Sequence, residues 1–373
     1  MNDMTTEKQN KRPNVPPLRF PEFTDEWNRT ELGNHITIYS GSSPNLIVDE
    51  NGEIPYYKVE QLNWCNKFLS DTPYLSKRNK LTLPPNCIVF SKRGAAILTN
   101  KVRINPFAIN IDTNLMGLSV NDSSSLDYNF LYYFILKAEL GKIADTSTIP
   151  QINNIHINPL IIPIPSIGEQ RKVAKFISLL DRRIVVQSKI IEQLESLMGG
   201  IIERLTAQSA NVRISDCLEC HSSTLQENQL NEVGKCHVYG ANGVCGYTDY
   251  PAINGDSILI VKDGSGVGNV SFATGEYSVI GTLNYLIAKN GYNLRYLYYC
   301  LKNFNFGPYK TGMAIPHIYF KDYGKAKIFC PALEEQERIA NILSKIEHKI
   351  VIERSITDHY IQQKQYLLQQ MFI

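Results

Sequence analysis

The feature that most constrains this 373-residue chain is that it repeats itself. Leu131-Tyr132-Tyr133 recurs as Leu297-Tyr298-Tyr299, and Glu169-Gln170 recurs as Glu335-Gln336, in each case 166 residues later. Many further positions keep this offset without a gap over about fifty residues. A constant offset at so many positions makes chance improbable and indicates two related copies of one structural unit.

Each copy has a front part that differs between the copies and a rear part that does not. We expect five segments: a flexible N-terminal tail at 1–17, a first domain at 18–165, a long helix at 166–208, a second domain at 209–330 and a second long helix at 331–373. Upstream of the shared region the offset drifts to 170 and then 182, so the first copy carries extra residues in its front part.

The front parts have the pattern of mixed α/β domains. Short β-branched and aromatic runs such as Cys87–Phe90 and Ser257–Val261 predict strands, because Pro, Asn and Gly bound them. Phe130–Glu139 and Arg295–Lys302 predict short helices from the spacing of their apolar residues.

The rear parts show a heptad pattern, with apolar residues at alternating steps of four and three. Ser166 with Glu169 three residues later is a capping-box signature for the start of the first helix. Because one long helix cannot bury such a stripe alone, we expect the two helices to pack antiparallel along this seam. The seam residues are Val173, Ile177, Leu180, Ile184, Ile191, Leu194, Ile339, Leu343, Ile346 and Ile350.

Three details qualify the helix pair. The alternative is that each helix packs only on its own domain. Gly199-Gly200 lie late in the first helix and are a possible bend, and the middle of the second seam is polar, from Glu353 to Lys364. Off the seam, isoleucines at 190, 202, 342 and 352 suggest further protein partners.

The expected fold class is α+β, with two pseudo-twofold-related mixed α/β domains separated by two long antiparallel coiled-coil helices.

Composition and motifs exclude several function classes. The net charge of +2 excludes a polycation, and no apolar stretch reaches the roughly 18 residues of a membrane span. The polar start carries no secretory signal, so we expect a cytoplasmic protein with its eight cysteines as thiols. There is no phosphate loop of the Gly-x4-Gly-Lys-Ser/Thr type, no Asn-Pro-Pro-aromatic motif and no His-Glu-x-x-His helix. We therefore expect no catalytic residues.

Two motifs allow other interpretations, which we weigh less. Cys217-Leu218-Glu219-Cys220-His221 spells a haem attachment string, but that chemistry requires export. A zinc site from Cys217, Cys220, Cys236 and Cys245 is possible on spacing, although a second Cys-x-x-Cys is missing. Gly264, Gly266 and Gly268 are a weak dinucleotide signal because their spacing differs from Gly-x-Gly-x-x-Gly. We expect no metal and no cofactor on this chain.

The positive signal is a set of basic, amide and aromatic residues on loops that occupy matching places in both copies. Arg and Lys bind guanine or phosphate, and Asn and Gln pair with adenine, so these residue types suit DNA. The candidates are Tyr57, Lys58, Gln61, Ser91, Lys92, Arg93, Gln151, Tyr239, Asn242, Lys262, Ser265, Asn269, Lys310 and His317. Two unlike domains at a fixed separation suit a duplex, whose groove faces recur about every 34–36 Å.

The chain resembles the specificity subunits of type I restriction–modification systems. The resemblance rests on the opening Leu18-Arg19-Phe20-Pro21-Glu22-Phe23-Thr24-Asp25-Glu26-Trp27 and on the twice-used Pro-x3-Glu-Gln-x3-Ala motif. It covers the chain from about Leu18 to the end.

The resemblance implies a non-catalytic subunit with two target recognition domains. Each domain would read one half of a bipartite site in double-stranded DNA, and the helices would set the unread gap and dock two modification subunits. Restriction subunits would join that core, and no membrane is involved. The modification subunits would use S-adenosylmethionine to methylate adenine in DNA, the partners would also use ATP and Mg, and none of these would be bound by this chain. The alternatives are a free-standing tandem adaptor that binds two protein or glycan ligands, and an enzyme with an unrecognised site.

Overall fold

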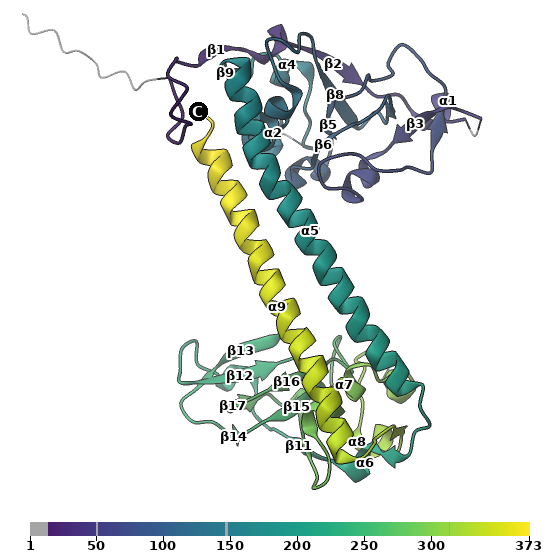
Figure 1. Cartoon of the computed structure of the whole chain (residues 1–373). Helices are drawn as coiled ribbons and strands as arrows, with labels where there is room; N and C mark the ends of the chain where they lie inside the picture. Colours follow the sequence, from purple (N-terminus) through teal and green to yellow (C-terminus); the bar gives the residue numbers. More distant parts are fainter. Residues whose placement is uncertain (1–13, 50, 146–147, 313) are drawn as a thin grey trace, which may run out of the picture. The chain divides into compact units, whose positions relative to one another are not determined.

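The structure is a computed structural model that describes residues 14–373 except 50, 146–147 and 313. It divides into two compact units: unit 1 comprises the described residues up to Ser188 together with Ile356–Ile373, and unit 2 comprises Lys189–Ser355. Each unit holds one mixed α/β domain and parts of two long helices, α5 (Ile167–Thr206) and α9 (Leu333–Gln370) (Figure 1). Most of the tail expected at 1–17 lies outside the described residues.

Domain 1, in unit 1, contains two small sheets. The four-stranded antiparallel sheet has the order β2-β8-β5-β6, the three-stranded sheet has the order β4-β3-β7, and β1 pairs with β9. The strands are β1 (Asn28–Glu31), β2 (Ile36–Ser40), β3 (Ile54–Tyr57), β4 (Leu75–Ser76), β5 (Ile88–Ser91), β6 (Val102–Ile104), β7 (Asn110–Ile111), β8 (Leu115–Val120) and β9 (Ile161–Ile164). The helices are α1 (Pro44–Ile47), α2 (Tyr128–Ala138), α3 (Leu140–Ile143) and α4 (Asn154–Ile157).

Domain 2, in unit 2, repeats this plan. Its sheets have the orders β11-β18-β15-β16 and β13-β12-β17-β14, and β10 pairs with β19. The strands are β10 (Val212–Arg213), β11 (Leu218–Ser222), β12 (Cys236–Gly240), β13 (Gly243–Thr248), β14 (Ile253–Asn254), β15 (Ser257–Val261), β16 (Val270–Ala273), β17 (Glu276–Val279), β18 (Leu283–Ala288) and β19 (Lys327–Ile328). The helices are α6 (Ile214–Cys217), α7 (Leu294–Lys302) and α8 (Phe320–Tyr323).

The sequences of β5 and β15 are continuously apolar because each of these inner strands is buried on both faces. Successive side chains of a strand point to opposite faces. In β5, Ile88 and Phe90 pack in the cluster that includes α2, whereas Val89 packs against the second sheet. In β15, Ile258 and Leu259 divide between two clusters in the same way. The strands predicted at Cys87–Phe90 and Ser257–Val261 are therefore confirmed as strands buried on both faces.

The long helices pack side by side within each unit, and they run antiparallel. In unit 1, Asp181 of α5 accepts an ion-pair hydrogen bond from Lys364 of α9 at 2.6 Å, while Arg183, further along α5, donates to Tyr360, earlier in α9, at 3.4 Å. In unit 2, Arg354 of α9 pairs with Glu195 of α5 at 2.5 Å. The fold class predicted from the sequence is confirmed, and the alternative of helices packed only on their own domains is wrong.

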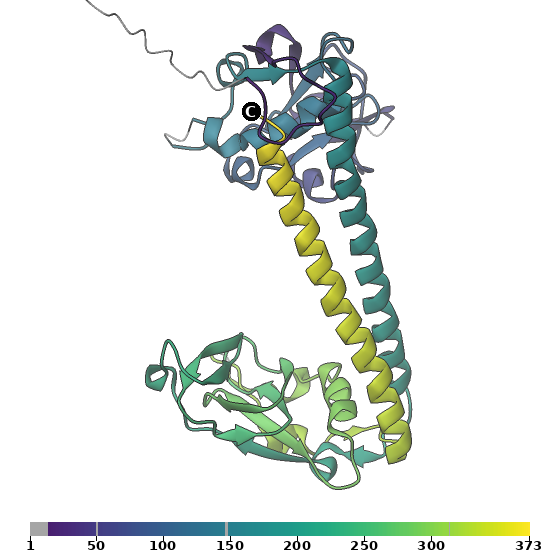
Figure 2. The same cartoon turned by 60° about the vertical axis from the view of Figure 1, so that its left-hand side comes forward.

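The end of each helix is also built into the core of the domain at which it arrives. Figure 2 shows the end of α9 lying beside domain 1. Leu367, Leu368 and Met371 belong to the domain 1 cluster together with Val173 and Ile177 at the start of α5. In domain 2, Ile202 near the end of α5 is buried in the cluster that holds Ile339 and Leu343. Ile202 was expected to face a further partner, and this expectation is wrong because the side chain fills the core instead.

In the repeated Glu-Gln pair, the glutamine has the same role in both copies. The buried Gln170 accepts from the Asp127 amide at 2.8 Å and donates to the carbonyls of Ser125 and Pro165, both at 2.9 Å. Asp127 is itself the N-cap of α2. Gln336 repeats the bond to a cap residue, since it accepts from the Asn293 amide at 3.0 Å and Asn293 caps α7. The glutamine therefore ties the short helix of each domain to the start of its long helix.

The glutamate differs between the copies. Ser166 does cap α5 by accepting from the Glu169 amide at 3.3 Å. The Glu169 carboxylate, however, takes a two-pronged contact from Arg19, at 2.7 and 2.8 Å, and a hydrogen bond from the Trp27 indole at 3.2 Å. The capping box is thus only half formed: Ser166 caps the helix, but the Glu169 carboxylate binds Arg19 and Trp27 instead of reaching back to the Ser166 amide. In the second copy, Glu335 pairs with Arg338 on the surface.

Candidate nucleic-acid interface

One edge of the main sheet of domain 1 gathers three loops. The chain leaves β5 at Ser91, and the amide of the next residue, Lys92, donates to the Asn114 carbonyl just before β8 at 2.8 Å. On its other side, the Lys92 carbonyl accepts from the Ile152 amide at 2.9 Å, and the Gly94 amide donates to the Pro150 carbonyl at 2.8 Å. We call residues 91–94, 112–114 and 150–152 the loop edge of domain 1.

Domain 2 builds the same edge with the same hydrogen bonds. The Lys262 amide donates to the Thr282 carbonyl at 2.9 Å, and the Lys262 carbonyl accepts from the Ile318 amide at 2.9 Å. The Gly264 amide donates to the Pro316 carbonyl at 3.0 Å. Residues 261–264, 281–283 and 316–318 are therefore the loop edge of domain 2. The backbone of this region is duplicated although its side chains differ.

Several predicted DNA-contact residues meet at these edges. Lys92, Arg93 and Gln151 come together in domain 1, although they lie far apart in the sequence, and Lys262 and His317 come together in domain 2. Ser265 and Asn269 follow in the loop between β15 and β16 and are exposed, as is Lys310, next to Thr311 on the loop that leads to His317. Their contact with DNA stays a prediction.

Three other candidates are placed inside domain 1. Tyr57 is 1% exposed and its hydroxyl donates to the Ser70 carbonyl. Gln61 is also 1% exposed and accepts from the Lys58 amide at 2.6 Å, while Ser91 donates to the Arg93 carbonyl at 3.2 Å. Because these polar groups are buried and hydrogen-bonded within the domain, they have structural roles here. This burial does not favour a contact with DNA bases.

The remaining candidates lie on the second sheets. The Lys58 ammonium is 3.6 Å from the centre of the Tyr74 ring, a cation–π contact. Tyr239 is half-buried and packs edge-on against Tyr277 with 5.6 Å between ring centres. Asn242 is exposed in the turn between β12 and β13. These three residues flank the loop edges rather than belonging to them.

Lys92 has a distinctive electrostatic setting. Burial lowers the pKa of its ammonium, and the opposing charge of Asp112 raises it by less. Asp112 is itself buried, and it accepts hydrogen bonds from the Asn114 amide and side chain, both at 2.7 Å. The positive charge of Lys92 is therefore partly balanced by Asp112, and a contact of Lys92 with phosphate stays a prediction.

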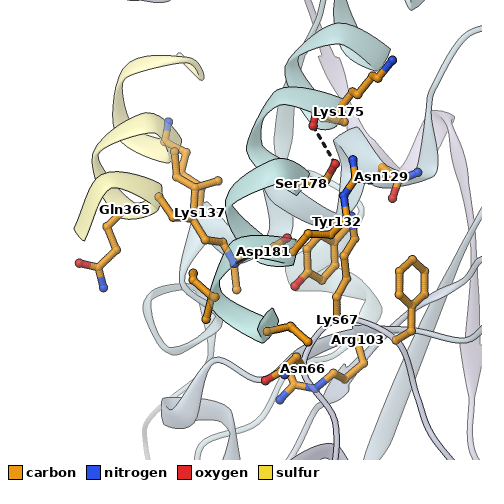
Figure 3. Close-up of a pocket in the computed structure, with 18 of the residues that line it drawn as sticks. Asn66, Lys67, Arg103, Asn129, Tyr132, Lys137, Lys175, Ser178, Asp181 and Gln365 are labelled. Carbon is orange, nitrogen blue, oxygen red and sulfur yellow. Dashed lines mark hydrogen bonds and ion pairs between the residues drawn. The ribbon is translucent and has the colours of Figure 1, made fainter. Parts of the chain in front are cut away.

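Unit 1 also contains a groove of about 1450 Å³ between α2, α5 and α9 (Figure 3). On its wall, Lys67 donates to the Tyr133 hydroxyl at 3.2 Å, and this hydroxyl donates to Asp181 at 2.5 Å. Burial lowers the pKa of Lys67 to about 8. This network joins domain 1 to both long helices, because Asp181 also pairs with Lys364.

Unit 2 has an equivalent of this network. Glu347 of α9 accepts from Tyr299 at 2.9 Å, from Tyr298 at 3.0 Å and from Lys302 at 2.9 Å. Burial raises the pKa of Glu347, but these hydrogen bonds outweigh burial and leave the pKa below its ordinary value. A tyrosine, a carboxylate and a lysine thus hold each domain to its helix.

The predicted seam residues differ in how far they are buried. Val173, Ile177, Leu180, Ile339, Leu343 and Ile350 are buried, whereas Ile184, Ile191, Leu194 and Ile346 are half-buried. The fully buried positions are concentrated where a helix also contacts its domain. Gln187, the break in the heptad series, is 9% exposed, and its side-chain nitrogen has no partner among the described residues.

Three residues at or beside the loop edges are not among the contacts predicted from the sequence. Asp263 stands at the place of Arg93, and Asp145 and Thr311 are the backbone partners of Gln151 and His317. Applying the copy-to-copy offsets of 170 and 166 to Arg93 and Asp145 would have found their counterparts. The offset could not reveal the structural roles of Arg19 and Trp27, because the second copy has no equivalent of these two residues.

Among the described residues, no group of three or more His, Cys, Asp or Glu side chains is arranged to hold a metal ion. Over the same part of the chain, no helix combines the length and the apolar character needed to cross a membrane.

The chain is similar to known proteins over almost its whole length. The family model for the type I restriction modification DNA specificity domain matches residues 24–196 and 208–359. The type I restriction enzyme EcoprrI specificity subunit of Escherichia coli is 22% identical over an alignment of length 368 that covers 89% of each chain.

Solved structures show the same fold. The S subunit of a type I restriction–modification system from M. genitalium matches with a TM-score of 0.67 and 18% identity, over 96% of this chain and 99% of that chain. A chain from a study of complex assembly and conformational transition in the type I R-M system matches with a TM-score of 0.56 and 14% identity, over 94% and 98% of the two chains.

The duplicated α+β domains and the paired long helices define a two-domain recognition scaffold. The family match, which spans both copies, goes further: the chain belongs to the specificity subunits of type I restriction–modification systems, with two recognition domains. The resemblance inferred from the sequence motifs is confirmed.

Proposed function

We propose that each recognition domain reads one half of a bipartite site in double-stranded DNA through its loop edge. The observation that carries this proposal is that both domains hold the same loops with the same backbone hydrogen bonds but present different side chains. One frame with two sets of side chains suits two unlike half-sites. Lys92 and Lys262, at equivalent places, would contact phosphates and position each domain.

We further propose that α5 and α9 set the length of the unread gap and dock two modification subunits. Both helices carry large apolar side chains that are exposed in their own unit, which supports a protein partner. They include Leu179 and Val186 in unit 1 and Leu197, Ile342, Val351 and Ile352 in unit 2. Restriction subunits would join the resulting core, and the assembly would act in the cytoplasm.

In this proposal the chain itself carries out no chemistry and holds no cofactor. S-adenosylmethionine, ATP and Mg would be used by the partner subunits. The alternative of a free-standing adaptor for protein or glycan ligands is not favoured, because the family match covers both domains.

The test is DNA binding by the purified chain with and without its modification subunit, measured on a pool of randomised duplexes. With a net charge of only +2, the chain alone should bind weakly. The complex should select a gapped sequence with two fixed halves. The modification subunit alone is the control. Equal binding of the complex to all duplexes would contradict the proposal.

A further inference from the structure

The two loop edges share a small backbone ladder at their rims. Arg93 lies directly opposite Gln151, and Asp263 lies directly opposite His317. In both cases the hydrogen bonds run between the flanking residues, so these are the non-hydrogen-bonded pairs of an antiparallel ladder. The Cα atoms of such a pair are only about 4.5 Å apart and the side chains stand close together on one face.

A third residue extends each pair into a row. The Asp145 amide and carbonyl exchange two hydrogen bonds with Gln151, both at 2.9 Å. Thr311 exchanges two with His317, at 2.9 and 2.8 Å. We call Arg93–Gln151–Asp145 and Asp263–His317–Thr311 the rim rows of domains 1 and 2.

The fold fixes the backbone of the rim rows but not their side chains. Ile152 and Ile318, which follow the central residues, are buried in both domains, at 0% and 1% exposure. Gly94 and Gly264, which follow the first residues, both have positive φ, 77° and 97°, so the chain turns sharply at the same point. Arg93 and Gln151 are exposed, so packing does not dictate their identity, whereas Asp263 and His317 are half-buried and packing constrains them in part.

The first position of the row changes from a cation to an anion between the domains. An arginine offers only donors, in a fork that fits the O6 and N7 acceptors of guanine. An ionised aspartate offers only acceptors, and in the major groove its partner is the N4 amino group of cytosine. A carboxylate on a DNA-facing rim is repelled by phosphates, so a donor on a base best accounts for Asp263 at this place.

We propose that Arg93 and Asp263 are the equivalent base-reading residues of the two domains, with Arg93 reading a guanine in one half-site and Asp263 a cytosine in the other. The inference rests on the proposed function and adds the identity of one base in each half. Gln151 stands beside Arg93 at a distance comparable to one base step and is placed to read the neighbouring pair, for which an amide favours adenine.

The test uses the full chain with its modification subunit, in cells that lack other adenine methylation, and reads the methylated sequence by sequencing genomic DNA. Arg93→Ala should relax one G·C pair in one half-site and leave the other half unchanged. Asp263→Ala should relax one C·G pair in the opposite half. On purified complexes, discrimination at that pair should fall about 5- to 150-fold.

Two amide variants sharpen the result. Arg93→Gln and Asp263→Asn should shift preference toward adenine at the same positions, because an amide offers both a donor and an acceptor. Arg78→Ala, an exposed cation of domain 1, and Asp256→Asn, at the opposite end of β15, are matched controls that should keep the parental sequence.

The outcomes separate this inference from the proposed function. An unchanged sequence, or a loss of binding that is equal for all duplexes, would identify phosphate contacts or no contact and overturn the inference. A parental complex without any bipartite sequence would overturn the proposed function itself. Thermal unfolding of each variant, expected to match the parental chain, shows that altered recognition is not a folding defect.

Discussion

At the residue scale, two buried glutamines hold the duplicated architecture together. Gln170 and Gln336 are 0% and 1% exposed, and each accepts from the backbone of the residue that caps the neighbouring short helix. Each also donates to a proline carbonyl just before its long helix. A buried side chain with this many bonds positions two elements at once, which explains why the glutamine stands at the same place in both copies.

Replacing either glutamine with leucine should therefore destabilise its own unit. Gln170→Leu and Gln336→Leu leave buried backbone groups unpaired, at a cost of about 1–3 kcal/mol in the free energy of unfolding. Gln193→Leu, at an exposed position of α5, should change it by less than about 0.5 kcal/mol. Urea unfolding measures the stability, and limited proteolysis should show which unit opens. Equal stability of all three variants would exclude the anchoring role.

The same residues show what could be predicted. The offset identified the Glu-Gln pair as a repeated motif, and the capping signature placed Ser166 at the start of α5. The partners could not be predicted, because the bonds of Glu169 come from Arg19 and Trp27, about 150 residues away. Equally, Tyr57 and Gln61 look like surface contacts in the sequence, and only the three-dimensional packing shows that they are buried.

At the element scale, periodicity predicted two long helices, and the structure contains them as α5 (Ile167–Thr206) and α9 (Leu333–Gln370). The second helix ends at Gln370 because Phe372 enters the core of domain 1 and packs against Trp27 and Phe130. A heptad pattern alone cannot distinguish a helix seam from such a core contact.

Lengthening α5 tests whether the helices act as a ruler. Four residues inserted after Gly199 add about 6 Å of helix and rotate the following residues by only about 40°. We expect the gap in the recognised sequence to change, or assembly with the modification subunit to fail. Gly199→Ala is the control, since no atom of the described residues beyond the helix's own nearby backbone lies within 4 Å of the added Cβ. Unchanged assembly with an unchanged gap would rule out the ruler.

At the scale of the whole molecule, the duplication was the most informative sequence feature. It predicted two domains of one topology, and the matching strand orders confirm it. The domain boundaries themselves stay a prediction. The structure adds that the segment before β1 belongs with the helices, because Arg19 binds Glu169 and the Leu18 amide donates to the Gln370 carbonyl at 2.9 Å.

The central claim is that the two domains recognise DNA independently, and exchanging one domain tests it most directly. The exchange should span residues 28–164, from β1 to β9, so that the native segment around Arg19 remains on the helices. With the modification subunit present, sequencing of methylated genomic DNA should show one new half-site beside the unchanged half read by domain 2. A chimera that assembles and methylates but alters both halves, or neither, would contradict the account.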